Sequence, residues 1–117
     1  MGITLVTLLK RRPGMSKAAF IAYYEAHHAR IGEEVLSGYA TRYERRYLFR
    51  ADGADSAPQD PDVVMEIDFP DAATRDACFA AMAAPEVMAR IVADEERLFD
   101  RAAMRVFTVE AHASRLG

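Results

Sequence analysis

The chain has 117 residues, a length that fits one domain with a single core, and we predict that residues 1–117 form that domain. Apolar residues make up 51% of it, so we expect a folded protein rather than a disordered one. Its 15 basic and 18 acidic side chains give a net charge of -3, which argues against a nucleic-acid partner because nucleic-acid binders normally carry a basic stripe.

The first third of the chain is typical of a strand followed by a long helix. The segment ITLVTLL (Ile3–Leu9) is rich in β-forming residues and is followed by a Pro-Gly break. Ser16 suits the N-cap of a helix over residues 17–37, and Gly38 suits the C-terminal cap of the same helix.

The middle of the chain is typical of two strands joined by a polar loop. Residues 39–49 alternate in a way that places Tyr43 and Tyr47 on the same face of a strand. The loop over residues 50–62 is rich in Gly, Pro and Asp and has no periodicity, so we expect it to be the most mobile part. VVMEIDF (Val63–Phe69) then predicts a third strand.

The last third predicts a helix interrupted by a proline, and then a final strand. An Ala-rich helix is expected after the Pro-Asp pair at residues 70–71, a further helix over 85–99, and a strand over 104–110. The order is therefore β-α-β-β-α-β. It predicts a ferredoxin-like α+β fold, with a four-stranded antiparallel sheet and both helical units on one face.

The other face of this sheet also needs cover. It carries too many bulky side chains for comfortable exposure, although it carries charges as well. A second copy of the chain is the simplest cover, so we predict a symmetric homodimer with its sheets face to face.

Cysteine content and hydropathy indicate where such a protein would work. Cys78 is the only cysteine, so no internal disulfide can form and a reducing compartment, the cytoplasm, is expected. No apolar run approaches the length that a bilayer requires and no signal pattern precedes the first strand, so we expect no membrane partner. The chain has no glycine-rich phosphate loop and no GxSxG motif, which argues against a nucleotide cofactor and against a serine hydrolase.

Two of the three histidines, His27 and His28, are adjacent in the predicted helix over 17–37. Each helical residue advances by about 100°, so His28 shares a stripe with Phe20 and Tyr24, whereas His27 lies on the opposite flank. Adjacent rings diverge by the same angle and cannot chelate one ion as an i, i+4 pair can. We therefore predict no metal site here.

Two interpretations of His28 stay open at this point. As a general acid or base it would use a pKa near neutrality, with Tyr24 one turn away donating a hydrogen bond to a substrate oxygen. As a packing residue it would instead bond a carboxylate or a backbone group. The spacing of the residues does not choose between them.

Several polar side chains elsewhere are candidates for the same site. Tyr43 and Tyr47 either line a ligand cleft or belong to the core. Glu66 lies mid-strand among apolar residues, where a charge needs a partner, and a salt-bridged layer inside a dimer is preferred over a catalytic dyad. Its candidate partners are Arg42, Arg46 and Arg105. Asp94 is the one acidic residue of a solvated helix segment that could turn inward.

The segment LLKRRPGMSKAAFIAYYEAHHARI resembles the opening of EthD-domain proteins, with a strand ending in Lys-Arg, a Pro-Gly turn, and a helix of the pattern F-x-x-Y-(W/Y)-x-x-x-H. VVMEIDFPDAATRDACFAAMAAPEV and ADEERLFDRAAMRVFTVE are similar to later parts of the same family. The pattern assigns the family histidine to His28 and leaves His27 as an extra. Tyr24 stands where Trp is common, and the loop over 50–62 has no counterpart.

The resemblance implies a ferredoxin-like protomer within a dimeric α+β barrel. The family is named after an ether-degradation gene cluster, and relatives in fungal polyketide pathways are similar to cofactor-free dehydratases or decarboxylases. The wider superfamily includes cofactor-free monooxygenases, polyketide cyclases, lactone isomerases and haem enzymes, so the fold alone gives no activity.

Three functional hypotheses follow. The first is a cofactor-independent enzyme of the dehydratase, decarboxylase, isomerase or cyclase type acting on a hydrophobic aromatic or polyketide-like molecule. In it His28 is the acid or base, and the residues contacting substrate are Tyr24, Tyr43, Tyr47 and Glu66. The second is a non-catalytic small-molecule-binding or accessory protein, and the third is a haem-binding protein with a histidine facing a haem-sized cavity. One ring nitrogen of His28 facing an apolar pocket would favour catalysis, and two bonded nitrogens would argue against it.

Overall fold

The computed structural model describes residues 2–117. Its elements are β1 Ile3–Leu9, α1 Lys17–Tyr23, η1 Tyr24–His28, α2 Ala29–Leu36, β2 Arg42–Tyr47, β3 Val63–Phe69, α3 Ala72–Met82, α4 Pro85–Leu98, η2 Arg101–Ala103 and β4 Arg105–Thr108. The segment η1 is π-helical and η2 is a 3-10 turn. Among the described residues, no helix combines the length and the apolar character needed to cross a membrane.

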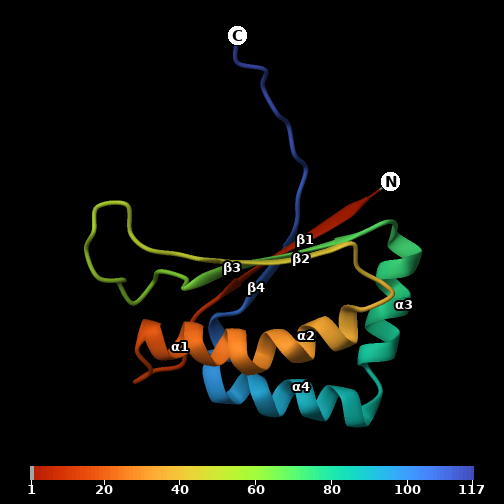
Figure 1. Ribbon diagram of the computed structural model, residues 1–117, viewed down its shortest axis with the longest axis horizontal. Coiled ribbons are helices and arrows are strands. Elements are labelled where there is room, and N and C mark those ends of the chain that lie inside the picture. The colour runs from red at the N-terminus through yellow and green to blue at the C-terminus, as the bar shows by residue number, and fades with distance from the viewer. Residues whose placement is uncertain (1) are drawn as a thin grey trace.

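The four strands form one sheet in the order β2-β3-β1-β4, and each neighbouring pair is antiparallel. Figure 1 shows the helices on one face of this sheet, while the segment after β4 runs away from the other face. The predicted ferredoxin-like α+β fold is therefore confirmed.

The helix ends follow the local chemistry that the sequence predicts. Ser16 and Asp71 each accept a hydrogen bond from the backbone amide three residues further on, at the starts of α1 and α3. Gly38 follows α2 with a φ of 85°, the left-handed conformation that commonly ends helices. Pro85 opens α4 and separates it from α3, so the predicted split of the second helical unit is confirmed.

Three predicted elements differ in detail. The strand over 39–49 shrinks to β2, because the amides of Tyr39 and Ala40 both bond the Leu36 carbonyl in the turn that leaves α2. The strand over 104–110 shrinks to β4, where pairing with β1 ends. The helix over 17–37 is interrupted by η1, whose hydrogen bonds span one residue more than those of an α-helix.

The core consists of two clusters between the helices and the sheet. The first gathers around Phe20, Tyr24 and Phe99, under α1 and η1. The second gathers around Phe69 and Cys78, under α3. Burial raises the pKa of the Cys78 thiol, which suits a packed side chain better than a reactive one.

Candidate functional site

A mostly apolar cavity of about 140 Å³ lies between the helices and the sheet. Its polar side chains are Thr7, Tyr24, His28, Tyr43 and Glu95, and the remaining lining is aliphatic, sulfur-containing or aromatic. An engineered apolar cavity of about 150 Å³ accepts benzene, so this cavity has room for roughly one aromatic ring. Sites for small molecules are commonly of this apolar kind, with a few polar groups.

His28 closes η1 and lies on the wall of this cavity. Its Nδ1 lies 2.8 Å from Oδ2 of Asp94, and its ring meets the rings of Tyr24 and Phe99 edge-on, with centroids 5.4 and 5.2 Å away. A carboxylate only accepts hydrogen bonds, so in the neutral ring Nδ1 carries the proton and Nε2 keeps its lone pair. Within residues 2–117, Asp94 is the hydrogen-bond partner of this ring and bonds only one of its nitrogens.

Asp94 reaches His28 from α4 and is itself fixed by a second donor. The Tyr23 hydroxyl donates to Oδ1 of Asp94 over 2.5 Å. Burial first, and then this hydrogen bond, raise the pKa of Tyr23, so its phenol stays protonated and keeps donating. Asp94, the acidic residue that the sequence marked as able to turn inward, is buried on the same helix face as Ile91 and Leu98. The role of Tyr23 has no comparable signal in the sequence.

His27 lies outside the cavity. Its ring packs against Tyr23 with a centroid distance of 4.7 Å, which agrees with the predicted flank position. Within residues 2–117, no three His, Cys, Asp or Glu side chains come close enough to hold a metal ion.

Tyr24 and Tyr43 bring two phenols to the cavity. Tyr24 is fully buried, and its hydroxyl has no hydrogen-bond partner within residues 2–117. The Tyr43 phenol lies close enough to raise the pKa of Tyr24, although burial is the larger cause and the two hydroxyls do not reach hydrogen-bond geometry. Burial also raises the pKa of Tyr43, so both phenols are protonated donors near neutral pH.

Gly32 permits the position of Tyr43. A Cβ atom at Gly32 would lie 2.6 Å from the Tyr43 hydroxyl oxygen and 2.8 Å from two of its ring carbons. Any other residue would therefore push the phenol away from α2. The sequence does not reveal this role, because it depends on a residue from the sheet.

Tyr47 lies next to the cavity rather than on its wall. Its ring packs edge-on against Phe20 and Tyr24, and its hydroxyl donates to Glu25. The same carboxylate accepts two hydrogen bonds from Arg45, at 2.9 and 2.7 Å. Tyr47 thus helps to connect η1 to the edge strand β2.

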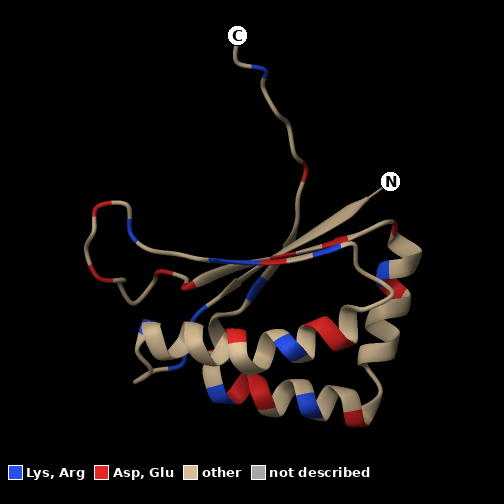
Figure 2. Cartoon of the chain, in the orientation of Figure 1, with Lys and Arg blue, Asp and Glu red and all other residues tan. Residues whose placement is uncertain are grey.

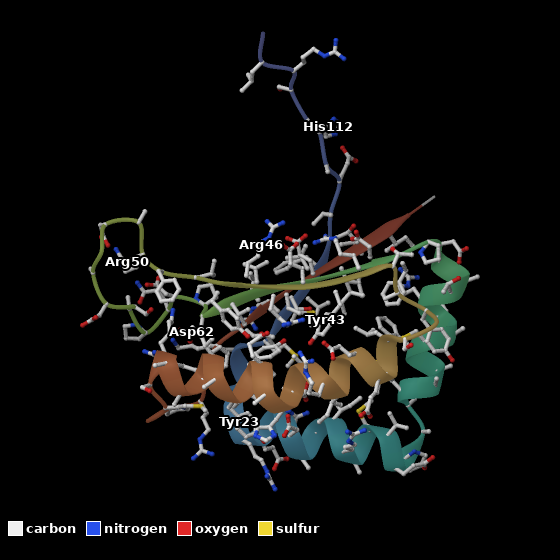
Figure 3. All side chains as sticks on the ribbon, viewed as in Figure 1. Tyr23, Tyr43, Arg46, Arg50, Asp62 and His112 are labelled. Carbon is white, nitrogen blue, oxygen red and sulfur yellow. The ribbon has the colours of Figure 1, made fainter. Side chains whose placement is uncertain are left out.

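Glu66 lies on the opposite face of the sheet from the cavity. It follows Met65 and precedes Ile67, which line the cavity, so its own side chain points the other way. It pairs with Arg42 at 2.7 Å and with Arg46 at 3.7 Å, whereas Arg105 is not among its partners. Figure 2 shows both signs of charge side by side along the sheet, and Figure 3 shows Arg46 and Tyr43 on opposite sides of it. The structure therefore does not bring Glu66 to His28.

The size of the cavity also tests the haem hypothesis. Pockets that hold drug-sized ligands measure about 300–1,000 Å³, and a haem is larger than most such ligands. A cavity of about 140 Å³ beside His28 does not fit a haem.

Comparison with known proteins agrees with this architecture. Residues 12–102 match the family model described as the EthD domain. An EthD-family protein of Bacillus halodurans shares 17% identity, with a TM-score of 0.66 over 96% of this chain and 100% of its own. For a NIPSNAP-like domain protein of Burkholderia xenovorans the identity is 21% and the TM-score 0.61, over 99% and 90% of the two chains.

A third solved structure is described as a dimeric protein of unknown function with a ferredoxin-like fold, from Bacteroides fragilis. It shares 12% identity and a TM-score of 0.55, over 94% of this chain and 96% of its own. No match is found among the curated proteins. The likeness to these structures shows the fold alone.

Proposed function

Because this chain belongs to the EthD-domain family, we propose that it is a cofactor-independent acid/base enzyme of the dehydratase, decarboxylase, isomerase or cyclase type. Its proposed substrate is a hydrophobic molecule of aromatic or polyketide-like character. The observation that carries the proposal is His28, which is bonded to Asp94 through Nδ1 and lies on the wall of an apolar cavity. Family membership by itself would not select a reaction.

In this proposal His28 moves the proton and Asp94 positions the ring. Nε2 accepts a proton from the bound molecule, for example from a carbon next to a carbonyl group. The positive charge that then forms on the ring is stabilised by the Asp94 carboxylate. The apolar walls strengthen this interaction because they keep water away.

Acetophenone tests the proposal, because it combines one aromatic ring with a carbonyl. In D₂O, the wild-type protein is expected to exchange the methyl protons of acetophenone for deuterium faster than buffer alone, as followed by ¹H NMR. His28→Gln should bring the rate back to that of buffer. Asp94→Asn should lower it at least about tenfold, because general acid-base catalysis contributes roughly 10²–10⁴-fold.

His27→Gln is the matched control, since its ring lies on the other flank of the helix and should leave the exchange rate unchanged. Equal rates of proton exchange in the wild type and in His28→Gln would contradict the proposal that the protein is an enzyme. Binding of acetophenone without exchange would instead support the second candidate, a small-molecule-binding or accessory protein, which the predominantly apolar lining favours.

We also propose that the protein works in the cytoplasm, because its single cysteine suits a reducing compartment. We further propose that it is a homodimer whose two sheets pack together through their outer faces. Figure 1 shows no helix on that face. The face carries Val6, Leu8, Val64 and Phe107, of which Phe107 is 49% exposed. The solved structure from Bacteroides fragilis with the same fold is described as dimeric, which supports a dimer for this chain.

A further inference from the structure

We propose that Tyr43 is a second functional residue of the cavity, which donates a hydrogen bond to the oxygen of a ligand while His28 faces the adjacent carbon. The ligand class is a benzene-sized ring that carries a carbonyl or phenolic oxygen. The proposal rests on the proposed function in one respect, namely that both residues serve the same ligand.

The position of Tyr43 relative to His28 follows from Gly32. Gly32 comes four residues after His28, so the two lie on the same side of the helix, about one turn or 5.4 Å apart. The Tyr43 hydroxyl lies against Gly32, in the space that a Cβ atom would fill. The phenol and the imidazole therefore border one cavity, where they can face the oxygen and the neighbouring carbon of one carbonyl ligand.

The surroundings of Tyr43 suit a donor to a developing negative charge. The Arg45 guanidinium lies 4.7 Å from the centre of the Tyr43 ring, and two hydrogen bonds to Glu25 fix the guanidinium in place. A positive charge at this distance favours electron density on the phenol oxygen. The charge of Arg45 thus partly offsets the burial that raises the pKa of Tyr43, while the phenol stays a protonated donor.

Tyr24 gives an independent reason to expect an acceptor oxygen here. Its hydroxyl is fully buried, borders the same cavity close to Tyr43, and has no partner within residues 2–117. A buried hydroxyl is unfavourable unless an acceptor takes a hydrogen bond from it. An oxygen of the ligand at this end of the cavity would complete the hydrogen bonds of both phenols.

The resulting step is balanced without a cofactor. The bond between the carbon and its proton breaks, and the proton passes to Nε2 of His28. The bonding electron pair forms a carbon–carbon double bond, and the carbonyl π electrons move to the oxygen, which the Tyr43 hydroxyl stabilises by its hydrogen bond. The product is an enolate, which can be reprotonated, can eliminate a leaving group or can attack another carbonyl.

p-Nitrophenol is a direct probe, because it is a single ring whose phenolate oxygen absorbs visible light. The wild type is expected to bind it, and Tyr43→Phe should bind it about tenfold more weakly, the effect of one hydrogen bond to a charged oxygen. Gly32→Ala should weaken binding similarly, because its methyl group displaces the phenol. Tyr39→Phe is the control, since Tyr39 packs in the second core cluster and is not on the cavity wall.

Affinities are measured by absorbance titration on proteins whose fold is checked by circular dichroism, and if Gly32→Ala fails to fold, Tyr43→Phe alone decides. If the wild type does not bind p-nitrophenol, or if Tyr43→Phe binds it as tightly as the wild type does, the proposal is overturned.

The acetophenone experiment distinguishes a failure of this proposal from a failure of the proposed enzyme activity. If Tyr43→Phe exchanges the methyl protons of acetophenone as fast as the wild type does, Tyr43 has no role but the proposed role of His28 stands. Loss of p-nitrophenol affinity in Tyr43→Phe, without any exchange by the wild type, keeps the donor and removes the enzyme.

Discussion

Two adjacent tyrosines, at the point where α1 ends and η1 begins, differ sharply in what their hydroxyls do. Tyr23 donates to Asp94, whereas the hydroxyl of Tyr24 is buried without a partner. Removing an unsatisfied buried hydroxyl should be neutral or favourable, while removing a bonded one should be unfavourable. The pair therefore offers a comparison in which the two substitutions are chemically identical.

We expect Tyr24→Phe to leave the free energy of unfolding unchanged or to raise it by up to about 1 kcal/mol. Tyr23→Phe should lower it by about 1 kcal/mol, because Asp94 then loses one of its two donors. Urea denaturation at neutral pH measures both values. A larger loss for Tyr24→Phe than for Tyr23→Phe would mean that the Tyr24 hydroxyl is satisfied, and the case for a ligand oxygen beside it would weaken.

Among the elements, η1 is tied to the edge strand β2 through one carboxylate. Glu25 accepts hydrogen bonds from Arg45 and from Tyr47, and the Arg45 bond is the main reason that the pKa of Glu25 is lowered. A carboxyl group with a lowered pKa in the folded state adds stability above its unfolded pKa and loses that contribution as the pH falls through the folded value. The link between η1 and β2 should therefore weaken in acid.

Glu25→Gln tests this link through its pH dependence. At pH 7 it should lower the free energy of unfolding by up to about 1 kcal/mol, a modest value because the side chain is 39% exposed. The difference from the wild type should shrink as the pH falls below about 4.3, the ordinary pKa of glutamate, and should vanish once the pH lies below the lowered pKa of the folded protein. Thermal unfolding at pH 7, 5 and 3 measures it.

Glu33→Gln is the matched control for Glu25→Gln. Glu33 pairs with Arg30 on the surface of the helix, and the substitution should change stability little at any of these pH values. A constant difference between Glu25→Gln and the wild type across the whole range would show that packing, and not charge, accounts for the effect.

The elements were predictable because their signals are local. Alternation, the caps at Ser16 and Asp71 and the break at Pro85 together give the βαββαβ order. The π-helical η1 was not predictable, since YEAHH contains no proline or glycine to mark it, although Tyr24 and His28 still pair across four residues.

The candidate site was predictable only in part, because its contacts join distant segments. His28 meets Asp94 across 66 residues, and the fit of Tyr43 onto Gly32 joins a strand to a helix. The sequence marked Asp94 as the acidic residue of its helix that could turn inward, but it could not name the group that Asp94 meets. Glu66 shows the converse. Its strand neighbours predicted a partnered charge, and the structure places that charge in an ion-pair network away from the cavity.

At the scale of the whole molecule, the outer sheet face has a charged part and an apolar part. In the charged part, Arg42 already bonds Glu66 at 2.7 Å and Asp68 at 2.8 Å. These groups satisfy one another within one chain. The apolar side chains next to β4 are not covered within the described part of one chain. Burying them against a second chain is therefore the largest favourable contribution to a dimer.

Phe107→Glu tests the proposed dimer at that place. Phe107 lies on the outer face of β4, opposite Val6, and a carboxylate there would have to be buried unpaired between two sheets. We expect the wild type to sediment as a dimer and Phe107→Glu as a monomer of 13.0 kDa with its fold intact. Leu116→Glu is the control, since Leu116 is 92% exposed in the C-terminal segment and the substitution should leave the dimer unchanged.

The same variant shows whether one chain suffices for the site. The described lining of the cavity comes from the helix side of a single chain, so monomeric Phe107→Glu should bind p-nitrophenol as tightly as the wild type does. A wild type that sediments as a monomer would contradict the dimer. A monomeric variant that has lost its affinity would show that the second copy shapes the cavity, because the substituted side chain lies on the opposite face of the sheet from His28 and Tyr43.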